Sequence, residues 1–196
     1  IGDQDRACLE AIRDVLDQKE VLRSEAMHEK DEARRIRYRS LGSAAEGGSK
    51  TDVVIGISPA FGIKLFQTTA GHRLSEVLGV LTQAIRERGL SPRVVRFHHT
   101  ADTSFLGLSA ARLAGSGIGI GIQAKGTAVI HQRDRLPHNN LELFSNAPIT
   151  QLEHYRTLGA NAAAYALGEM PQPVIVPQRG EAMGSRYHAR VAMIYA

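Results

Sequence analysis

Residues 115–127, with the sequence GSGIGIGIQAKGT, constrain the fold more than any other segment of this chain. Read as a strand, the segment places three isoleucines on one face and three glycines on the other. The isoleucines are Ile118, Ile120 and Ile122, and the glycines are Gly117, Gly119 and Gly121. Glycine weakens a strand, so three in register require another body to approach closely. That body is a flat ligand, a helix or a partner subunit, and the sequence leaves these three open.

The same glycines come close to a nucleotide-binding motif. Gly119, Gly121 and Ala124 fit the pattern G-x-G-x-x-A. In dinucleotide-binding proteins this pattern lies in a turn between a strand and a helix, where it meets the pyrophosphate. Here it falls inside the strand, and the residues that follow favour more strand. No G-K-[ST] motif is present either, so the sequence argues against nucleotide binding by both mechanisms.

Segments with strand and helix patterns alternate from residue 51 onward. Strands are expected at 52–57, 93–97, 118–122, 127–131 and 189–195, and helices at 74–88, 103–113 and 150–167. We expect Phe105, Leu108 and Leu113 to face inward on the second helix. A capping-box pattern, Thr150–Glu153, opens the third helix, which also carries a small-residue face for close packing, formed by Gly159, Ala162, Ala163 and Ala166. The order predicts a Rossmann-like three-layer α/β fold with a mainly parallel sheet over residues 51–196.

Residues 1–50 have a different character. Residues 5–39 are rich in charge and favour a helix, whose apolar stripe is formed by Leu9, Ile12 and Leu16. From residue 25 to residue 39 the stripe nearly vanishes, and residues 40–50 have the composition of a flexible linker. We therefore predict an N-terminal helical extension and linker before the α/β domain.

Composition excludes several classes of protein. The 196 residues contain no long apolar run and no apolar segment of a secretory signal, so we expect a cytoplasmic chain that does not enter a membrane. The single cysteine, Cys8, rules out an internal disulfide framework. The net charge is +4, but basic and aromatic residues form no interleaved stripe, so we expect no nucleic-acid partner.

Polar residues follow the predicted strands, at the edge where α/β proteins bind ligands. The segments 58–62, 98–102 and 123–126 would meet there and bring Asp102 near Lys125. A carboxylate and an ammonium group together suit a large polar ligand with amides, hydroxyls or a phosphate. Two alternatives stay open: Asp102 as the N-cap of the helix at 103, and Lys125 as an ordinary surface lysine.

The sequence offers neither a catalytic set nor a metal site. The eight histidines show no H-x-x-x-H or H-E-x-x-H spacing, and His98 and His99 face opposite ways in a strand. There is no G-x-S-x-G motif, and Cys8 is not at a strand end. We expect a ligand-binding edge without catalytic residues of its own.

Several ordered blocks resemble one family. They are residues 54–62 (VIGISPAFG), 115–131, 140–144 (NLELF), Ala147-Pro148, Tyr155-Arg156 and residues 161–163. These blocks resemble the medium (beta) subunit of adenosylcobalamin-dependent diol and glycerol dehydratases, over about residues 51–195. A second, lower-ranked resemblance is to the small subunit of the factor that reactivates these dehydratases and releases damaged cofactor.

The first resemblance implies a hydro-lyase that converts a 1,2-diol or glycerol to an aldehyde by radical chemistry. It implies large and small partner subunits in a dimer of heterotrimers, with the substrate site on the large subunit. This chain would bind adenosylcobalamin and contribute to assembly, without catalytic residues or a metal. The family's aspartate and lysine contacts fall on Asp102 and Lys125. Gly117, Gly119, Gln123 and Asn140 complete the expected cofactor-binding set.

Two departures from the family bear on this expectation. The family's usual serine before the Asn-Leu motif is Asn139 here, which puts a contact at that position in doubt. The sequence also lacks D-x-H-x-x-G, consistent with a cofactor that keeps its own base as lower ligand. The stretch around Cys8–Leu16 resembles an encapsulation peptide, which would dock residues 5–20 on the shell of a bacterial microcompartment. The alternative is a helix that packs on its own complex.

Overall fold

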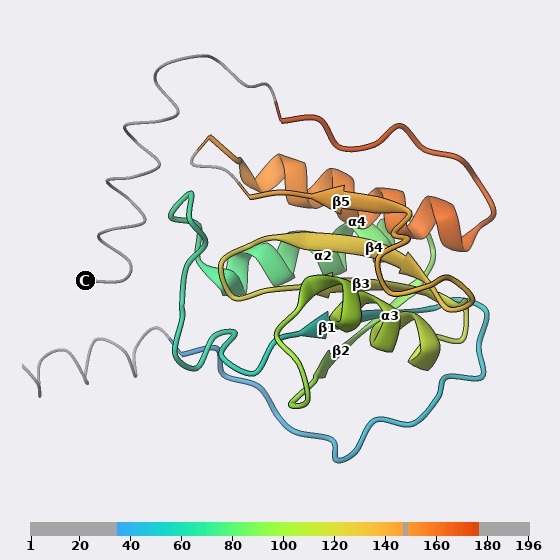
Figure 1. Ribbon diagram of the computed structural model, residues 1–196, viewed down its shortest axis with the longest axis horizontal. Coiled ribbons are helices and arrows are strands. Elements are labelled where there is room, and N and C mark those ends of the chain that lie inside the picture. The colour runs from blue at the N-terminus through green and yellow to red at the C-terminus, as the bar shows by residue number, and fades with distance from the viewer. Residues whose placement is uncertain (1–34, 147–148, 177–196) are drawn as a thin grey trace, which may run out of the picture. The chain divides into compact units, whose positions relative to one another are not determined.

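The computed structural model describes residues 35–146 and 149–176, which form a five-stranded sheet with three helices (Figure 1). The strands are β1 (Asp52–Ile57), β2 (Ser91–Arg96), β3 (Ile118–Ile122), β4 (Ala128–Gln132) and β5 (Glu142–Phe144). The helices are α2 (Leu74–Glu87), α3 (Thr103–Leu113) and α4 (Leu152–Ala166). These elements confirm the three predicted helices and four of the five predicted strands, and add β5. The expected helix over 5–34 and the expected strand at 189–195 lie outside the described residues, and residues 35–39 are not helical.

The sheet is mixed, which corrects the expectation of a mainly parallel sheet. Its strand order is β2-β1-β3-β4-β5, in which β1 is parallel to β2 and β3, while β4 is antiparallel to β3 and β5. The reason is the short connection after β3. The Gln123 amide donates to the Thr127 carbonyl at 2.9 Å, which closes a hairpin. A hairpin can join only antiparallel strands.

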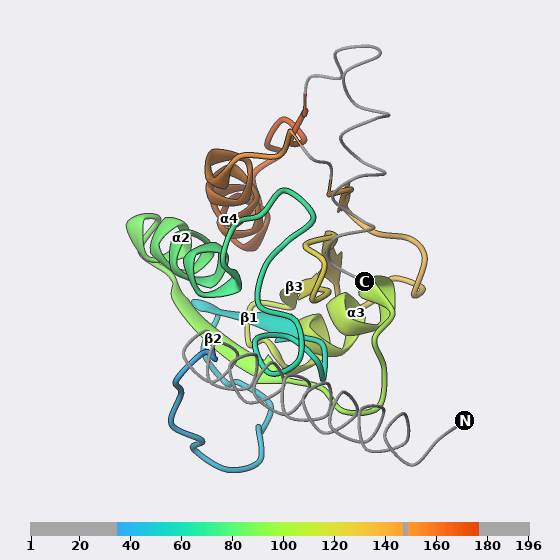
Figure 2. The ribbon, with the colours of Figure 1, turned by 90° about the vertical axis from the view of Figure 1, so that its left-hand side faces the viewer.

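The helices cover both faces of the sheet, as the three-layer prediction requires (Figure 2). Helices α2 and α4 lie on the face that carries the isoleucines of β3, and α3 lies on the opposite face. The small-residue face of α4 packs on α2. A Cβ on Gly159 would lie only 2.8 Å from the Leu81 carbonyl oxygen, so the close packing predicted for this helix is confirmed.

Helix α3 is the body that approaches the glycines of β3. A Cβ added to Gly119 would overlap the backbone nitrogen of Ala111, and one on Gly121 would overlap the backbone nitrogen of Gly107. The inward face of α3 is accordingly small, with Gly107, Ala110 and Ala111 buried. Phe105, which we expected to face inward, is 43% exposed, because the close approach leaves no space for a ring.

The start of α4 differs by one residue from the predicted capping box. Gln151 rather than Thr150 is the N-cap residue, and its backbone amide donates to Nδ1 of His154 at 2.8 Å. His154 thus takes the part that the pattern assigned to Glu153.

Residues 36–50, which include the expected linker, have neither helix nor strand but are attached to the domain at both ends. The Ile36 amide donates to the Gly62 carbonyl at 3.2 Å, and the Gly47 amide to the Leu113 carbonyl at 2.8 Å. Nη1 of Arg93 donates to the Ala45 carbonyl at 2.7 Å. Between these points Leu41 is 86% exposed. The domain boundary at residue 51 stays a prediction.

Candidate functional site

The order of the strands identifies one edge of the sheet as the place for a ligand. From β1 the chain continues to β2 on one side of the sheet, whereas β3, which lies on the other side of β1, continues to β4 and β5 further away. The direction in which strands are added therefore reverses between β1 and β3. In open α/β sheets, ligands bind outside the carboxyl ends of the strands at such a point. Figure 2 faces the end of the molecule where β1 and β3 finish.

The loops after β1 and β3 are joined at this edge by Ser58. The Ser58 amide donates to the Ile122 carbonyl at 3.3 Å, and its hydroxyl accepts from the Ala124 amide at 3.2 Å. The end of β2 reaches the same region, because Nη1 of its last residue, Arg96, donates to the Ser58 carbonyl at 3.0 Å. The structure therefore brings the loops after β1 and β3 and the end of β2 to one edge, as the sequence predicts.

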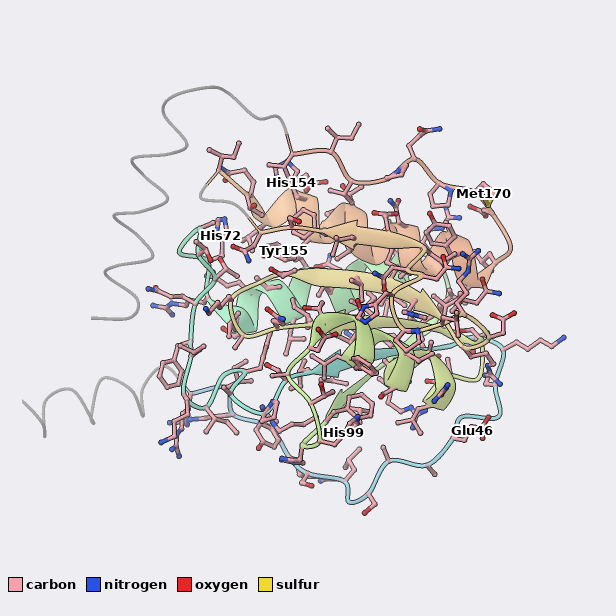
Figure 3. All side chains as sticks on the ribbon, viewed as in Figure 1. Glu46, His72, His99, His154, Tyr155 and Met170 are labelled. Carbon is pink, nitrogen blue, oxygen red and sulfur yellow. The ribbon has the colours of Figure 1, made fainter. Side chains whose placement is uncertain are left out.

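Lys125 lies exposed on the turn between β3 and β4. Two residues from other parts of the chain, Thr69 before α2 and Tyr155 on α4, hold this turn by hydrogen bonds. The Lys125 carbonyl oxygen accepts from the Thr69 amide at 3.1 Å and from the Thr69 hydroxyl at 3.3 Å. The Tyr155 hydroxyl donates to the Gly126 carbonyl at 2.8 Å. Tyr155 and His72 lie at this end of the molecule, opposite to Glu46 (Figure 3).

Burial keeps Tyr155 in the form that this hydrogen bond needs. Its side chain is fully buried, and burial raises the pKa of the Tyr155 phenol above its usual range. The group therefore remains an O–H donor at any physiological pH.

Asp102 is the N-cap of α3. Its Oδ1 accepts from the Ser104 amide at 2.9 Å and from the Phe105 amide at 3.1 Å. The capping alternative is thus confirmed, and the helix begins where the sequence indicates. The residue is exposed, and a contact with a cofactor stays a prediction.

Asn140 meets the same first turn of α3. Its Nδ2 lies 3.3 Å from the Ser104 hydroxyl oxygen, so Asn140 and Asp102 both bond to Ser104. Its Oδ1 is buried and has no hydrogen-bond partner among the described residues. A buried acceptor without a donor is destabilising by about 1–3 kcal/mol. Such an oxygen is suited to receive an N–H group from a ligand.

Two of the six predicted cofactor residues lie away from this region. Gly119 is covered by α3, so its close contact is with the helix. Gly117 lies at the opposite edge of the sheet, where its carbonyl accepts from the Arg133 amide at 3.0 Å. Gln123 begins the β3–β4 turn and is half-buried. The carboxyl edge and the first turn of α3 thus hold Asp102, Gln123, Lys125 and Asn140.

Sequence reasoning missed the residues that support this edge. The sequence places Ser58 at this edge but not its bonds to Ile122 and Ala124, and it singles out Tyr155 only through the resemblance. Nothing in the sequence relates Thr69 to Lys125, since 56 residues separate them. Such supports become visible only when the layers are assembled.

The other polar features do not form a competing site. A hollow of about 160 Å³ lies between α2 and α4, but the charged side chains that line it already form ion pairs, as in the contact of Arg156 with Glu87 at 2.7 Å and that of Arg88 with Glu169 at 2.6 Å. Within residues 35–146 and 149–176, no three metal-ligating side chains gather. In the same ranges no helix is long and apolar enough to cross a bilayer.

Comparison with known proteins gives a family and a fold. A family model described as "Dehydratase medium subunit" matches residues 58–172. A solved structure titled "Glycerol dehydratase reactivase" is similar with a TM-score of 0.50 and 19% identity, over 61% of this chain and 94% of that chain. Another, of a diol dehydratase-reactivating factor complexed with ADP and Mg²⁺, has a TM-score of 0.44 and 18% identity, over 66% and 97% of the two chains.

Proposed function

The chain belongs to the dehydratase medium subunit family, and we propose that it is the medium subunit of a coenzyme B12-dependent diol or glycerol dehydratase. The family match, which covers residues 58–172, carries this proposal and confirms the resemblance at the level of the family. The family is one of multisubunit B12-dependent dehydratases. A subunit that shares its cofactor with partners needs a ligand-binding edge and no catalytic set, which is what the sequence suggests.

The chemistry of the edge suits cobalamin. The corrin ring carries amide arms, and its nucleotide tail carries a phosphate. Lys125 offers an ammonium group for an amide oxygen or the phosphate, and the unpartnered Oδ1 of Asn140 offers an acceptor for an amide N–H. Asp102 adds an exposed carboxylate. We propose that Lys125, Asn140, Asp102 and Gln123 hold this side of the cofactor.

When bound, the cofactor would supply the radical chemistry that dehydrates a 1,2-diol or glycerol to an aldehyde. This chain would bind and orient the cofactor, and it would exclude water from the side of the cofactor that faces this edge of the sheet. The large subunit would carry the substrate site, and two heterotrimers of large, medium and small subunits would form the complete enzyme.

Co-purification tests the proposal. The tagged chain is co-expressed with candidate large and small subunits, purified, and its absorption spectrum recorded after incubation with adenosylcobalamin. A heteromer that retains corrinoid and dehydrates a diol supports the proposal. Recovery with an ATPase partner instead, without corrinoid, would indicate the reactivating-factor alternative. A chain that binds neither set of partners would contradict both.

We also propose that residues 5–20 recruit the complex to a microcompartment shell, in an organism that builds one. The support is the narrow apolar stripe of Leu9, Ile12 and Leu16, residues that lie outside the described part of the chain. Replacing Ile12 and Leu16 by glutamate should abolish co-localisation with shell protein while activity remains. Loss of subunit assembly in this variant would show instead that the stripe packs within the complex.

A further inference from the structure

Ser104, in the first turn of α3, joins two of the residues that we propose to hold the cofactor. Its backbone amide donates to Oδ1 of Asp102 at 2.9 Å. Its hydroxyl oxygen accepts from Nδ2 of Asn140 at 3.3 Å. Asn140 comes 36 residues later in the chain, near the end of the loop between β4 and β5. Two segments that are distant in sequence therefore meet at Ser104.

These contacts leave one donor and one acceptor unused. A serine hydroxyl has one proton and two lone pairs. Because the Ser104 hydroxyl accepts from Asn140, its proton remains available, and it has no other hydrogen-bond partner among the described residues. Oδ1 of Asn140 is likewise without a donor in this part of the chain. The pair thus offers an O–H donor together with a carbonyl acceptor.

A primary carboxamide complements this pair. Its carbonyl oxygen accepts one hydrogen bond, and its N–H group donates another. A carboxylate has no proton to donate, so it would leave Oδ1 of Asn140 without a partner. It would also meet the negative charge of Asp102, which is exposed and bonded to the same turn of the helix. A phosphate is disfavoured for both reasons, so the chemistry of the pair favours a neutral amide.

Oδ1 of Asn140 is covered in the free chain, so a ligand must move a side chain to reach it. Two aromatic rings lie near the pair in the sequence, since Phe105 follows Ser104 and His138 precedes Asn140 by two positions. These rings pack edge to face with centroids 5.7 Å apart, and both residues are exposed. They can therefore turn outward without opening the core.

We propose that Ser104 and Asn140 together bind one primary carboxamide of the ligand and discriminate against a carboxylate in its place. Ser104 then has two roles, because it fixes the orientation of the Asn140 amide and donates its own proton to the ligand. The assignment of this carboxamide to an arm of the corrin ring rests on the proposed function. The unused donor and acceptor do not rest on it.

Cobalamin binding to the assembled complex tests the pair. The dissociation constant of cyanocobalamin is measured for wild type, Ser104→Ala and Asn140→Leu. Each variant should bind about tenfold more weakly, because one hydrogen bond to the ligand is lost. Ser104→Thr retains the hydroxyl and should bind as wild type does. Ser109→Ala is the matched control on the same helix, where the hydroxyl pairs with His99 at 3.3 Å, and its affinity should be unchanged.

Analogues of the cofactor test the chemistry of the ligand. In the monocarboxylic acids of cyanocobalamin, a carboxylate replaces one primary amide. Wild type should bind the acid that carries this change at the contacting arm about tenfold more weakly than cyanocobalamin. Ser104→Ala and Asn140→Leu should lose most of this discrimination and keep that against the other acids. Equal discrimination by wild type and both variants against every acid would overturn the proposal.

The stability of the full chain without cofactor separates a binding role from a structural one. Asn140→Leu loses the bond to Ser104 but also removes a buried oxygen that has no donor. We therefore expect this variant to melt no lower than wild type. A lower melting temperature with unchanged cofactor affinity would mean that Asn140 only supports the loop. A wild-type complex that binds no corrinoid would instead overturn the proposed function, while the melting temperatures still show whether this oxygen destabilises the fold.

Discussion

The phenol of Tyr155 donates a hydrogen bond to the carbonyl oxygen of Gly126 across 2.8 Å, and so joins helix α4 to the turn between β3 and β4. Gly126 has a φ of +102°, which L side chains rarely adopt, and a Cβ there would overlap the Tyr155 hydroxyl. The turn that presents Lys125 is thus shaped by a residue 29 positions further along the chain.

Replacing Tyr155 by phenylalanine should lower the free energy of unfolding by about 1–3 kcal/mol, because the Gly126 carbonyl would lose its buried donor. Denaturant titration of the two proteins measures this difference. Tyr38→Phe is the matched control. Tyr38 is 60% exposed and contacts Arg96 through its ring, which phenylalanine retains, so this variant should change the free energy of unfolding by no more than about 0.5 kcal/mol. Equal effects in both variants would contradict a supporting role for the phenol.

Lys125→Ala should weaken the binding of adenosylcobalamin to the assembled complex by about 1.5–3 kcal/mol, since a charge-assisted hydrogen bond would be lost. Equilibrium binding followed by absorption measures the change. Lys64→Ala, at another exposed lysine on a neighbouring loop, should leave affinity unchanged. If the Lys125 variant binds as wild type does, the lysine is an ordinary surface residue.

Gly119→Ala should destabilise the fold more than Ile120→Val. The added methyl group would overlap the backbone of α3 at Ala111, and overpacking costs about 1–3 kcal/mol. The shortened Ile120 side chain leaves a small cavity, which costs about 0.5–1.5 kcal/mol. Thermal melting of the two variants compares them. A Gly119 variant as stable as the Ile120 variant would show that α3 can move away at little cost.

Two truncations should behave differently. Removing residues 1–35 keeps the contacts of Ala45 and Gly47, so we expect a melting temperature close to that of the full chain. Removing residues 1–50 takes away the Gly47 amide, one of two donors to the Leu113 carbonyl, and the Ala45 carbonyl, one of the acceptors of Arg93, so the melting temperature should fall. Differential scanning calorimetry decides between the outcomes. A 1–50 deletion as stable as the full domain would mean that the attached segment contributes nothing to the fold.

The ion pair between α2 and α4 should make stability depend on acidic pH. Arg156, with help from Gln83, holds the pKa of Glu87 below its ordinary value of 4.5. A lowered pKa in the folded state adds stability above pH 4.5, and this is lost as the pH falls through the folded value. Arg156→Met should remove part of this acid dependence, measured by unfolding at several pH values. An unchanged profile would show that solvent screens the pair completely.

Local patterns in the sequence were sufficient to locate most of the elements. The apolar spacing of Leu74, Val77, Leu81 and Ile85 specifies α2, and alternation specifies β3. Asp102 marked the start of α3 because a capping side chain acts within its own turn. The ordered blocks from residue 54 to residue 163 also identified the family, which the match over residues 58–172 confirms.

Tertiary structure alone decided what covers each face. From the sequence, a ligand, a helix or a partner subunit could cover the glycine face of β3. Only the packed domain shows that α3 covers it. The outward position of Phe105 follows from the same packing, whereas the direction of β4 follows from the hairpin that joins it to β3. The supports of the site, in which Thr69 bonds to Lys125 and Tyr155 to Gly126, depend on backbone carbonyl groups. Every residue carries such a group, so no sequence pattern can distinguish the ones that are used.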